Sequence, residues 1–220
     1  MKKTILLIIA AFIVTNVYAQ TPEGNEYNYQ RRTLFEILPT TTSDIIFLGN
    51  SITDGCEWSE LFGNPNMKNR GISADRSYWI LNRLDPIIQG KPSKLFLLIG
   101  VNDLGAGDSP QSIIENTAKI IERFQEESPQ TKLYVQSIFP VNNDFPKFAK
   151  RHSSKNQEIV ETNELLKDLC TQKNIPFIDV HSKLADQDGK LSTEYTNDGL
   201  HLMGQGYLVW KEVLEEYIND

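Results

Sequence analysis

The chain has 220 residues, a length that suits one domain with a substantial core, and a formal net charge of −7. Because an acidic protein is repelled by nucleic acid and by anionic membrane surfaces, both are poor candidates as partners. A neutral small molecule or a glycan is the more economical partner. Two cysteines, Cys56 and Cys170, are too few for a disulfide framework or a metal site of the usual kind, and we expect unpaired, at least partly buried thiols.

Residues 1–19 have the features of a signal peptide. Lys2 and Lys3 precede the apolar stretch 5–14, and Val17 and Ala19 place small residues where a signal peptidase reads them. The apolar stretch is too short to span a bilayer comfortably, so a retained anchor is the less favoured interpretation. The sequence predicts cleavage after Ala19, export to the periplasm or the extracellular space, no stable membrane insertion afterwards, and one domain of residues 20–220.

Two periodicities alternate along this domain. Helical spacing of apolar residues predicts helices, and short apolar runs predict strands. The predicted helices span residues 27–38, 57–62, 74–89, 109–124, 156–173 and 204–217, with Ser73 and Ser109 as the caps of the third and fourth. The predicted strands span residues 45–49, 67–71, 95–99, 133–138 and 176–180. Such alternation predicts a parallel sheet covered by helices on both faces, with the loops that follow the strands meeting at one edge.

A hydroxyl follows the first predicted strand, at Ser51. A serine is a poor nucleophile at neutral pH unless a base takes its proton, and histidine is the usual base. That histidine needs an acceptor for its Nδ1–H so that Nε2 faces the serine. Asp198 and His201, three residues apart on a loop with a glycine, have the spacing for this contact.

The other two histidines are alternatives. His152 lies in a polar stretch beside Arg151 and Lys155, which predicts a solvated surface position. His181 follows Asp179 at the end of the last predicted strand, so it lies on the correct edge and stays a candidate. His201 is preferred because of the pattern around it.

Attack on an ester also needs donors for the developing oxyanion. Asn102 can donate without carrying a charge, and a glycine at position 71 lets the backbone approach a substrate closely. The alternative is that Gly71 and Gly100 are ordinary turns at strand ends and that Asn102 is an Asx-turn residue.

Four short motifs in order resemble those of the SGNH hydrolases, also called GDSL-type esterases and lipases. They are Gly49-Asn50-Ser51, Asn69-Arg70-Gly71, Gly100-Val101-Asn102-Asp103 and Asp198-Gly199-Leu200-His201. The resemblance implies an α/β fold, a three-layer αβα sandwich with a five-stranded parallel sheet of flavodoxin-like type. It implies ester hydrolysis through an acyl-enzyme, with no cofactor and no metal.

The resemblance also implies individual roles. Ser51 is the nucleophile, His201 the base and then the acid, and Asp198 the group that orients His201. The oxyanion hole comprises the backbone N–H groups of Ser51 and Gly71 and the side-chain amide of Asn102. The sequence departs from the family at Asn50, where aspartate is usual, although none of these roles falls on that position. Asp103 is expected to support the Asn102 loop.

The substrate is harder to predict. The second motif is more similar to the branch with platelet-activating-factor acetylhydrolase-like and carbohydrate O-acetylesterase members, which implies small acyl groups such as acetyl on a carbohydrate ester. A lysophospholipase or short-chain lipase is the alternative enzyme, and a non-catalytic glycan-binding module the alternative class. The intact Ser51, Asp198, His201 and Asn102 favour the enzyme. The aromatic residues that can line a substrate site are Trp58, Tyr78, Trp79, Phe139, Phe145 and Phe148.

Overall fold

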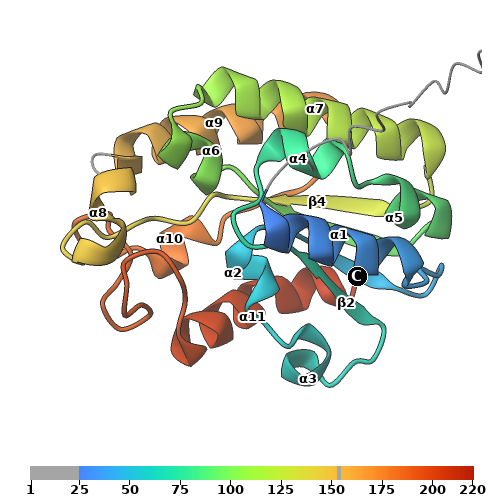
Figure 1. Ribbon diagram of the computed structural model, residues 1–220, viewed down its shortest axis with the longest axis horizontal. Coiled ribbons are helices and arrows are strands. Elements are labelled where there is room, and N and C mark those ends of the chain that lie inside the picture. Colours follow the sequence, from blue (N-terminus) through green and yellow to red (C-terminus); the bar gives the residue numbers. More distant parts are fainter. Residues whose placement is uncertain (1–24, 153–154) are drawn as a thin grey trace, which may run out of the picture.

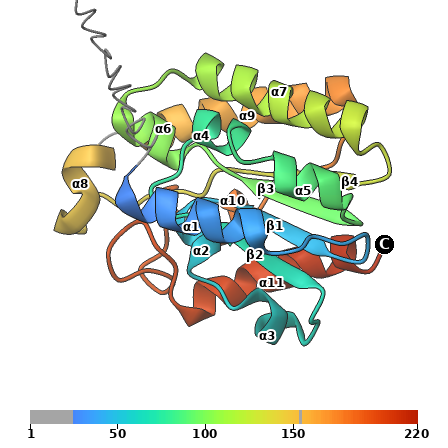
Figure 2. The ribbon, with the colours of Figure 1, turned by 45° about the vertical axis from the view of Figure 1, so that its right-hand side comes forward.

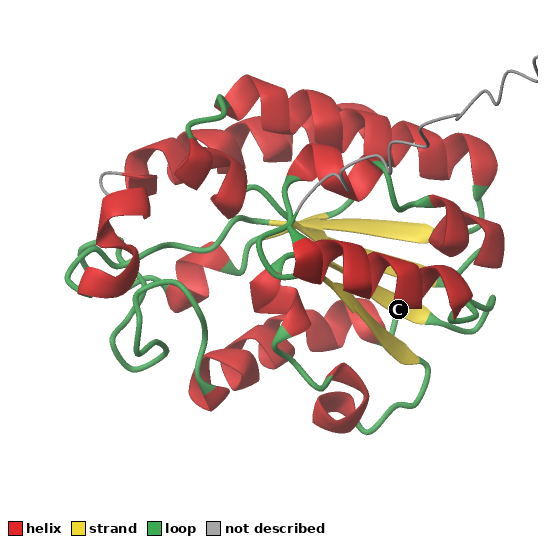
Figure 3. Cartoon of the chain, viewed as in Figure 1, coloured by secondary structure: helices red, strands yellow, loops and turns green. Residues whose placement is uncertain are grey.

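The computed structural model describes residues 25–152 and 155–220. The predicted signal peptide and its cleavage site lie outside these residues. A five-stranded sheet with all neighbouring strands parallel forms the middle layer, in the order β2-β1-β3-β4-β5. Its strands are β1 (Ile45–Gly49), β2 (Met67–Gly71), β3 (Lys94–Leu98), β4 (Lys132–Gln136) and β5 (Phe177–Ile178). Figure 3 shows these strands in the centre, with helices on both sides.

Helices make up the two outer layers. They are α1 (Glu26–Ile37), α2 (Ser51–Asp54), α3 (Trp58–Phe62), α4 (Ser77–Leu81), α5 (Asp85–Gly90), α6 (Val101–Ala106), α7 (Pro110–Glu127), α8 (Pro146–His152), α9 (Lys155–Lys173), α10 (His181–Leu184) and α11 (Gly204–Ile218). Figures 1 and 2 both show α7 and α9 over one face of the sheet and α3 and α11 over the other. The predicted α/β sandwich is therefore confirmed.

The central strands β1 and β3 form because nearly all of their residues are apolar, on both faces of the sheet. Every residue of β1 and β3 is buried, as expected for parallel strands between two helical layers. The sheet order reverses between β1 and β3, and doubly wound sheets bind ligands at such a switch point. Figure 1 shows α2, α6, α8 and α10 gathered at the end of the sheet where the strands finish.

An aromatic ladder crosses the sheet on the α11 side. Phe47, Phe96 and Tyr134 are register partners on β1, β3 and β4, and their rings stack with centroid distances of 5.2 and 4.6 Å. Trp58 lies over Phe47 at 3.8 Å, and Trp210 of α11 meets Trp58 edge-on at 4.7 Å. Such contacts add to the stability gained from burying large rings. The ladder thereby fixes α11, the helix that follows the His201 loop.

The predicted helix over residues 74–89 is wrong in one respect, because the segment forms two short helices, α4 and α5. Ser73 is not a cap: its hydroxyl donates to Asp54, and Ala74 is left-handed with φ 67°. Instead Asp103 accepts the first N–H of α4, from Ser77, at 2.9 Å. Pro86 then lies in the first turn of α5, a position that proline tolerates and a helix interior does not.

Four short helices were not predicted: α2, α6, α8 and α10. Each follows a strand of the sheet directly or through one loop, and each is too short for a clear apolar period. Along the described residues, no helix is both long enough and apolar enough to cross a membrane.

Candidate active site

Three residues from two distant parts of the chain meet at the end of β1. Ser51 Oγ lies 2.9 Å from His201 Nε2, and His201 Nδ1 lies 2.8 Å from Asp198 Oδ2. Since an ionised carboxylate can only accept, the proton on this side must reside on Nδ1, and Nε2 of the neutral ring is left to accept from the serine. The structure thus brings together the three residues predicted to act as nucleophile, base and orienting acid.

The Asp198 carboxylate is held by its own loop. Its Oδ1 accepts the backbone N–H groups of His201 at 2.8 Å and Leu200 at 3.0 Å. Burial by itself raises the pKa of Asp198, but these N–H groups and the His201 side chain outweigh it and lower the pKa to about 2. Lys147 Nζ also lies 3.3 Å from Oδ2. Asp198 is therefore ionised at neutral pH.

Asn50 caps the short helix that begins with Ser51. It is the N-cap of α2, and its Oδ1 accepts the N–H of Ile52 at 3.0 Å, a contact that aspartate would make equally well. The Asn50 side chain is buried, and its Nδ2 has no hydrogen-bond partner among the described residues. The departure from the family pattern thus keeps the cap and leaves one buried amide nitrogen unsatisfied.

Asn102 lies in the first turn of α6, directly after β3. Its Nδ2 donates to the backbone oxygen of Asp75 at 3.0 Å, which orients the amide and leaves the second N–H of Nδ2 available. The next residue, Asp103, accepts the N–H and hydroxyl of Ser77 at 2.9 and 2.6 Å. Burial raises the pKa of Asp103 to about 6, against the lowering effect of the Ser77 bonds. Asp103 supports this loop, as expected from the sequence.

Gly71 is placed differently from the prediction. Its N–H donates to Asn69 Oδ1 at 2.8 Å and is not free to meet a substrate. A Cβ at this position would run into the backbone of Thr53 and Asp54, so the glycine serves the close packing of β2 against α2. The predicted oxyanion N–H of Gly71 therefore disagrees with the structure.

The next candidate donor in the same loop is Ser73. Its hydroxyl donates to Asp54 Oδ2 at 3.1 Å. Asp54 is the last residue of α2 and lies three positions after Ser51, so this bond holds Ser73 beside the helix that begins with the nucleophile candidate. Within the described ranges, the backbone N–H groups of Ser51 and Ser73 have no hydrogen-bond partner. Both N–H groups, with the Asn102 amide, are available to an oxyanion.

In the described part of the chain, the two other histidines make no hydrogen bond to Ser51 or Asp198. His181 follows β5, which is separated from β1 by two strands, or about 14 Å at the usual strand spacing. Its backbone N–H donates to Ser137 Oγ at 2.8 Å, and burial lowers the pKa of its ring. His152 is only 2% exposed, so its predicted solvated position is wrong. It faces inward because α8 packs against α6.

The aromatic candidates separate into two groups. Trp58 and Phe139 are 1% exposed and belong to the core, so they cannot line a substrate site. Phe148 of α8 meets the His201 ring edge-on at 5.3 Å and lies beside the catalytic candidates. Tyr78 is exposed, and Trp79 and Phe145 are half-buried.

A buried polar network that we did not predict supports the residues of the site. The guanidinium of Arg83 binds Asp75 Oδ2 at 2.7 Å and the backbone oxygen of Gly49 at 3.1 Å. Asn28 of α1 donates to the other Asp75 oxygen at 3.1 Å. Asp75 thus connects α1, the end of β1 and Asn102. The only sequence signal was its position four residues after the Gly71 motif.

The site offers no evident place for a metal ion. Nowhere in the described part of the chain do three or more His, Cys, Asp or Glu side chains gather as ligands. Cys56 and Cys170 are both free and buried. Burial raises the pKa of each to about 12, with Glu57 adding to the effect at Cys56, so neither is a thiolate at neutral pH.

Comparison with known proteins is consistent with this geometry. Residues 47–209 match the model of the GDSL-like Lipase/Acylhydrolase family. Platelet-activating factor acetylhydrolase IB subunit alpha2 of Rattus norvegicus is 25% identical over 182 residues, which cover 80% of this chain and 76% of that protein.

Two solved structures are similar over nearly the whole fold. One from Streptococcus pneumonia, described as a platelet activating factor, has a TM-score of 0.78 and 32% identity and covers 87% of this chain and 91% of its own. An acylhydrolase from Bacteroides fragilis has a TM-score of 0.77 and 25% identity, with coverages of 90% and 98%. The chain therefore belongs to the GDSL-like lipase/acylhydrolase family and is an enzyme that hydrolyses esters.

Proposed function

We propose that the enzyme removes small acyl groups, acetyl above all, from carbohydrate esters through a Ser51 acyl-enzyme. The observation that carries this proposal is the pair of hydrogen bonds that joins Ser51, His201 and Asp198 at 2.9 and 2.8 Å. No structural requirement explains these three polar side chains in contact, whereas acyl transfer needs all of them.

The steps follow from the geometry. Ser51 Oγ attacks the ester carbonyl carbon while His201 Nε2 takes its proton. The carbon–oxygen bond to the alcohol then breaks, and His201 returns the proton to the departing oxygen. Water, deprotonated by His201, attacks the acyl-Ser51, and the carboxylic acid leaves as Ser51 regains its proton. Asp198 remains ionised throughout, because its pKa is about 2.

The oxyanion hole in this proposal comprises the backbone N–H groups of Ser51 and Ser73 and the Nδ2 of Asn102. The bond from Asn102 to the Asp75 carbonyl fixes its amide before the reaction, so the donor needs no reorganisation when charge develops. Fixed dipoles of this kind stabilise the transition state more than the ground state.

Asn102→Ala is expected to lower kcat about 10²–10³-fold with little change in KM, because one oxyanion donor is lost. Asn102→Asp keeps the shape but places a carboxylate where negative charge develops, so its loss should be at least as large. Steady-state kinetics on an aryl acetate measure both variants. A kcat within a factor of three of the wild type for Asn102→Ala would remove this residue from the oxyanion hole.

Several observations support an acetyl group as the acyl part of the substrate and a carbohydrate as its alcohol part. The rat relative is by name an acetylhydrolase. Tyr78 and Trp79 are partly exposed and meet edge-on at 5.4 Å, which leaves aromatic surface on α4 for a sugar ring. The proposal includes export of the protein, for which the support is the signal-peptide pattern of residues 1–19.

A short-chain lipase or lysophospholipase is the second candidate, and one feature favours it. An open, mainly apolar depression of about 430 Å³ lies between α2, α3 and the start of α11. It is lined by Gly55, Cys56, Glu57, Glu60, Leu61, Gly204, Gln205, Tyr207 and Leu208. Ser51 is the first residue of α2, and the lining residue Tyr207 donates its hydroxyl to the backbone oxygen of Ile52, the residue after Ser51, at 2.8 Å. An acyl chain on Ser51 therefore has an apolar surface close by.

A chain-length series separates the two candidates. Aryl esters from acetyl to decanoyl are compared by kcat/KM, beside acetylated oligosaccharides. The proposal expects the highest value for acetyl, a fall of at least about tenfold by hexanoyl, and release of acetate from the oligosaccharides. A maximum at longer chains, with inert oligosaccharides, would replace the proposal by the lipase.

A further inference from the structure

Two arginines flank Asn102 from different parts of the chain. Arg76 directly follows Asp75, the residue whose carbonyl orients the Asn102 amide. Arg151 Nη2 donates to the carbonyl oxygen of Asn102 at 3.4 Å. The Arg151 guanidinium therefore contacts the residue that is proposed to hold the oxyanion, and the backbone of Arg76 is one residue away from that residue's other contact.

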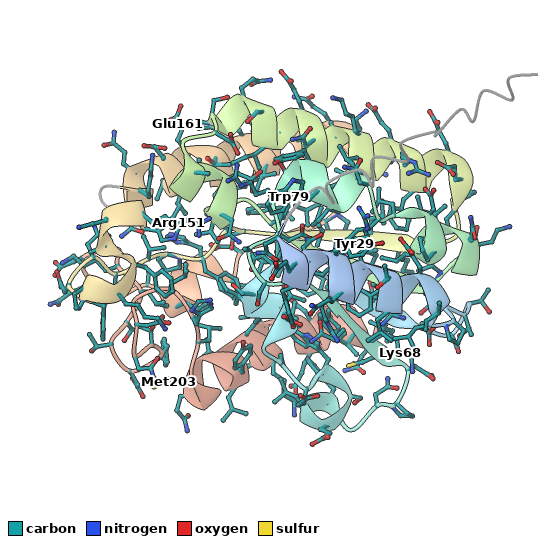
Figure 4. All side chains as sticks on the ribbon, in the orientation of Figure 1. Tyr29, Lys68, Trp79, Arg151, Glu161 and Met203 are labelled. Carbon is teal, nitrogen blue, oxygen red and sulfur yellow. The ribbon has the colours of Figure 1, made fainter. Side chains whose placement is uncertain are left out.

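Helix α8 brings Arg151 to this place. The helix packs against α6, where Gly105 has no side chain, and the Nε of Arg151 is 3.0 Å from the position that a Cβ would take there. Three residues earlier, Phe148 packs on the His201 ring. Arg151 is half-buried, and Figure 4 shows it on α8 with Trp79 on α4. The helix thus extends beside the site from His201 to Asn102.

The Arg76 side chain also has defined contacts. Its guanidinium lies over the Trp79 ring, 5.4 Å from the centroid, and Nη1 lies 3.4 Å from Asp108 Oδ2. The Arg76 side chain is 27% exposed. Its Nε is buried and has no hydrogen-bond partner within the residues that the structure describes.

The charges around this pair are only partly compensated. Burial lowers the pKa of Arg151, and the like charge of Arg76 lowers it further. Asp103 attracts Arg151 without forming an ion pair with it: Oδ1 of Asp103 accepts both bonds from Ser77, and Oδ2 has no hydrogen-bond partner among the described residues. Asp108 makes only the long contact with Arg76. Arg151 forms no ion pair among the described side chains. A bound anion would offset this repulsion.

We infer that Arg76 and Arg151 together bind an anionic group, a carboxylate or a phosphate, on the alcohol part of the ester. The inference rests on the proposed function, because an acetyl group carries no charge and the anion must then belong to the alcohol. Planar guanidinium groups match both anions with paired hydrogen bonds. The substrate class is thereby narrowed to acetyl esters of acidic or phosphorylated sugars.

Matched esters test this inference. Three substrates share one sugar ring and one acetyl group: a neutral methyl hexoside, the methyl hexuronoside and the hexoside 6-phosphate. The readout is the ratio of kcat/KM for each charged ester to that for the neutral ester, at fixed ionic strength. This ratio does not depend on the fraction of folded enzyme, so a partly unfolded variant is still informative. Arg151→Gln and Arg76→Gln are compared with Lys150→Gln, which removes an exposed charge from the same helix.

The wild type is expected to prefer at least one charged ester about tenfold or more, and each arginine variant to reduce that ratio about tenfold. Lys150→Gln should leave the ratio unchanged. Preference for the uronoside or for the phosphate identifies the anion, and either supports the inference. A wild-type ratio of one or less, or ratios unaffected by both arginine variants, overturns it while hydrolysis of the neutral ester keeps the proposed function. If none of the three esters is hydrolysed, the proposed function fails and the inference with it.

Discussion

Ser51→Ala is expected to lower ester hydrolysis by at least about 10⁴-fold and to abolish labelling by a fluorophosphonate, because no other group in the site can form the acyl intermediate. Among the described residues, the Ser51 side chain bonds to His201 alone, so the fold should be unaffected. Turnover of an aryl acetate, intact-protein mass after labelling, and circular dichroism measure the three effects.

Ser59→Ala is the control for this variant. Ser59 is exposed on α3, and its removal should change neither turnover nor labelling. Labelling at a residue other than Ser51 in the wild-type protein would show that the nucleophile has been assigned wrongly. Retained turnover in Ser51→Ala would have the same meaning.

His201→Ala should be the second variant with a very large effect, a loss of at least about 10⁴-fold in kcat. The imidazole takes the serine proton and returns it to the leaving group, so both halves of the reaction lose their proton carrier. Fluorophosphonate labelling of Ser51 should slow in parallel. His181→Ala is the matched comparison and should keep close to full activity, since β5 places this residue well away from Ser51.

The reverse pattern is the informative failure. If His181→Ala loses activity and His201→Ala does not, then the base has been assigned to the wrong histidine. Rescue of His201→Ala by added imidazole would support the assignment further, because the small base can take the place of the missing ring.

The sheet and the catalytic candidates could be predicted because their signals are local. Residues 45–49 and 95–99 are continuously apolar, and a buried parallel strand needs no more information than that. Asp198 and His201 are only three residues apart in sequence, so their contact depends on the conformation of one short loop. Ser51 follows a strand end, and the parallel topology itself brings strand ends together.

The remaining features depend on contacts between distant segments. Nothing near Gly71 in the sequence shows that the Asn69 side chain takes its N–H, so that this N–H is not free to meet a substrate. His152 has polar neighbours in sequence, yet α6 covers it. The start of α4 depends on Asp103, which lies 26 positions from the Ser77 N–H that it accepts.

The 150 positions between Ser51 and His201 have a consequence for how the enzyme folds. Contacts between such distant segments form late, since a long loop must close before they contribute any stability. The catalytic pair is complete only when α11 has docked on the aromatic ladder through Trp210. During refolding, the return of esterase activity therefore reports the docking of the last helix, while tryptophan fluorescence reports the ring packing that secures it.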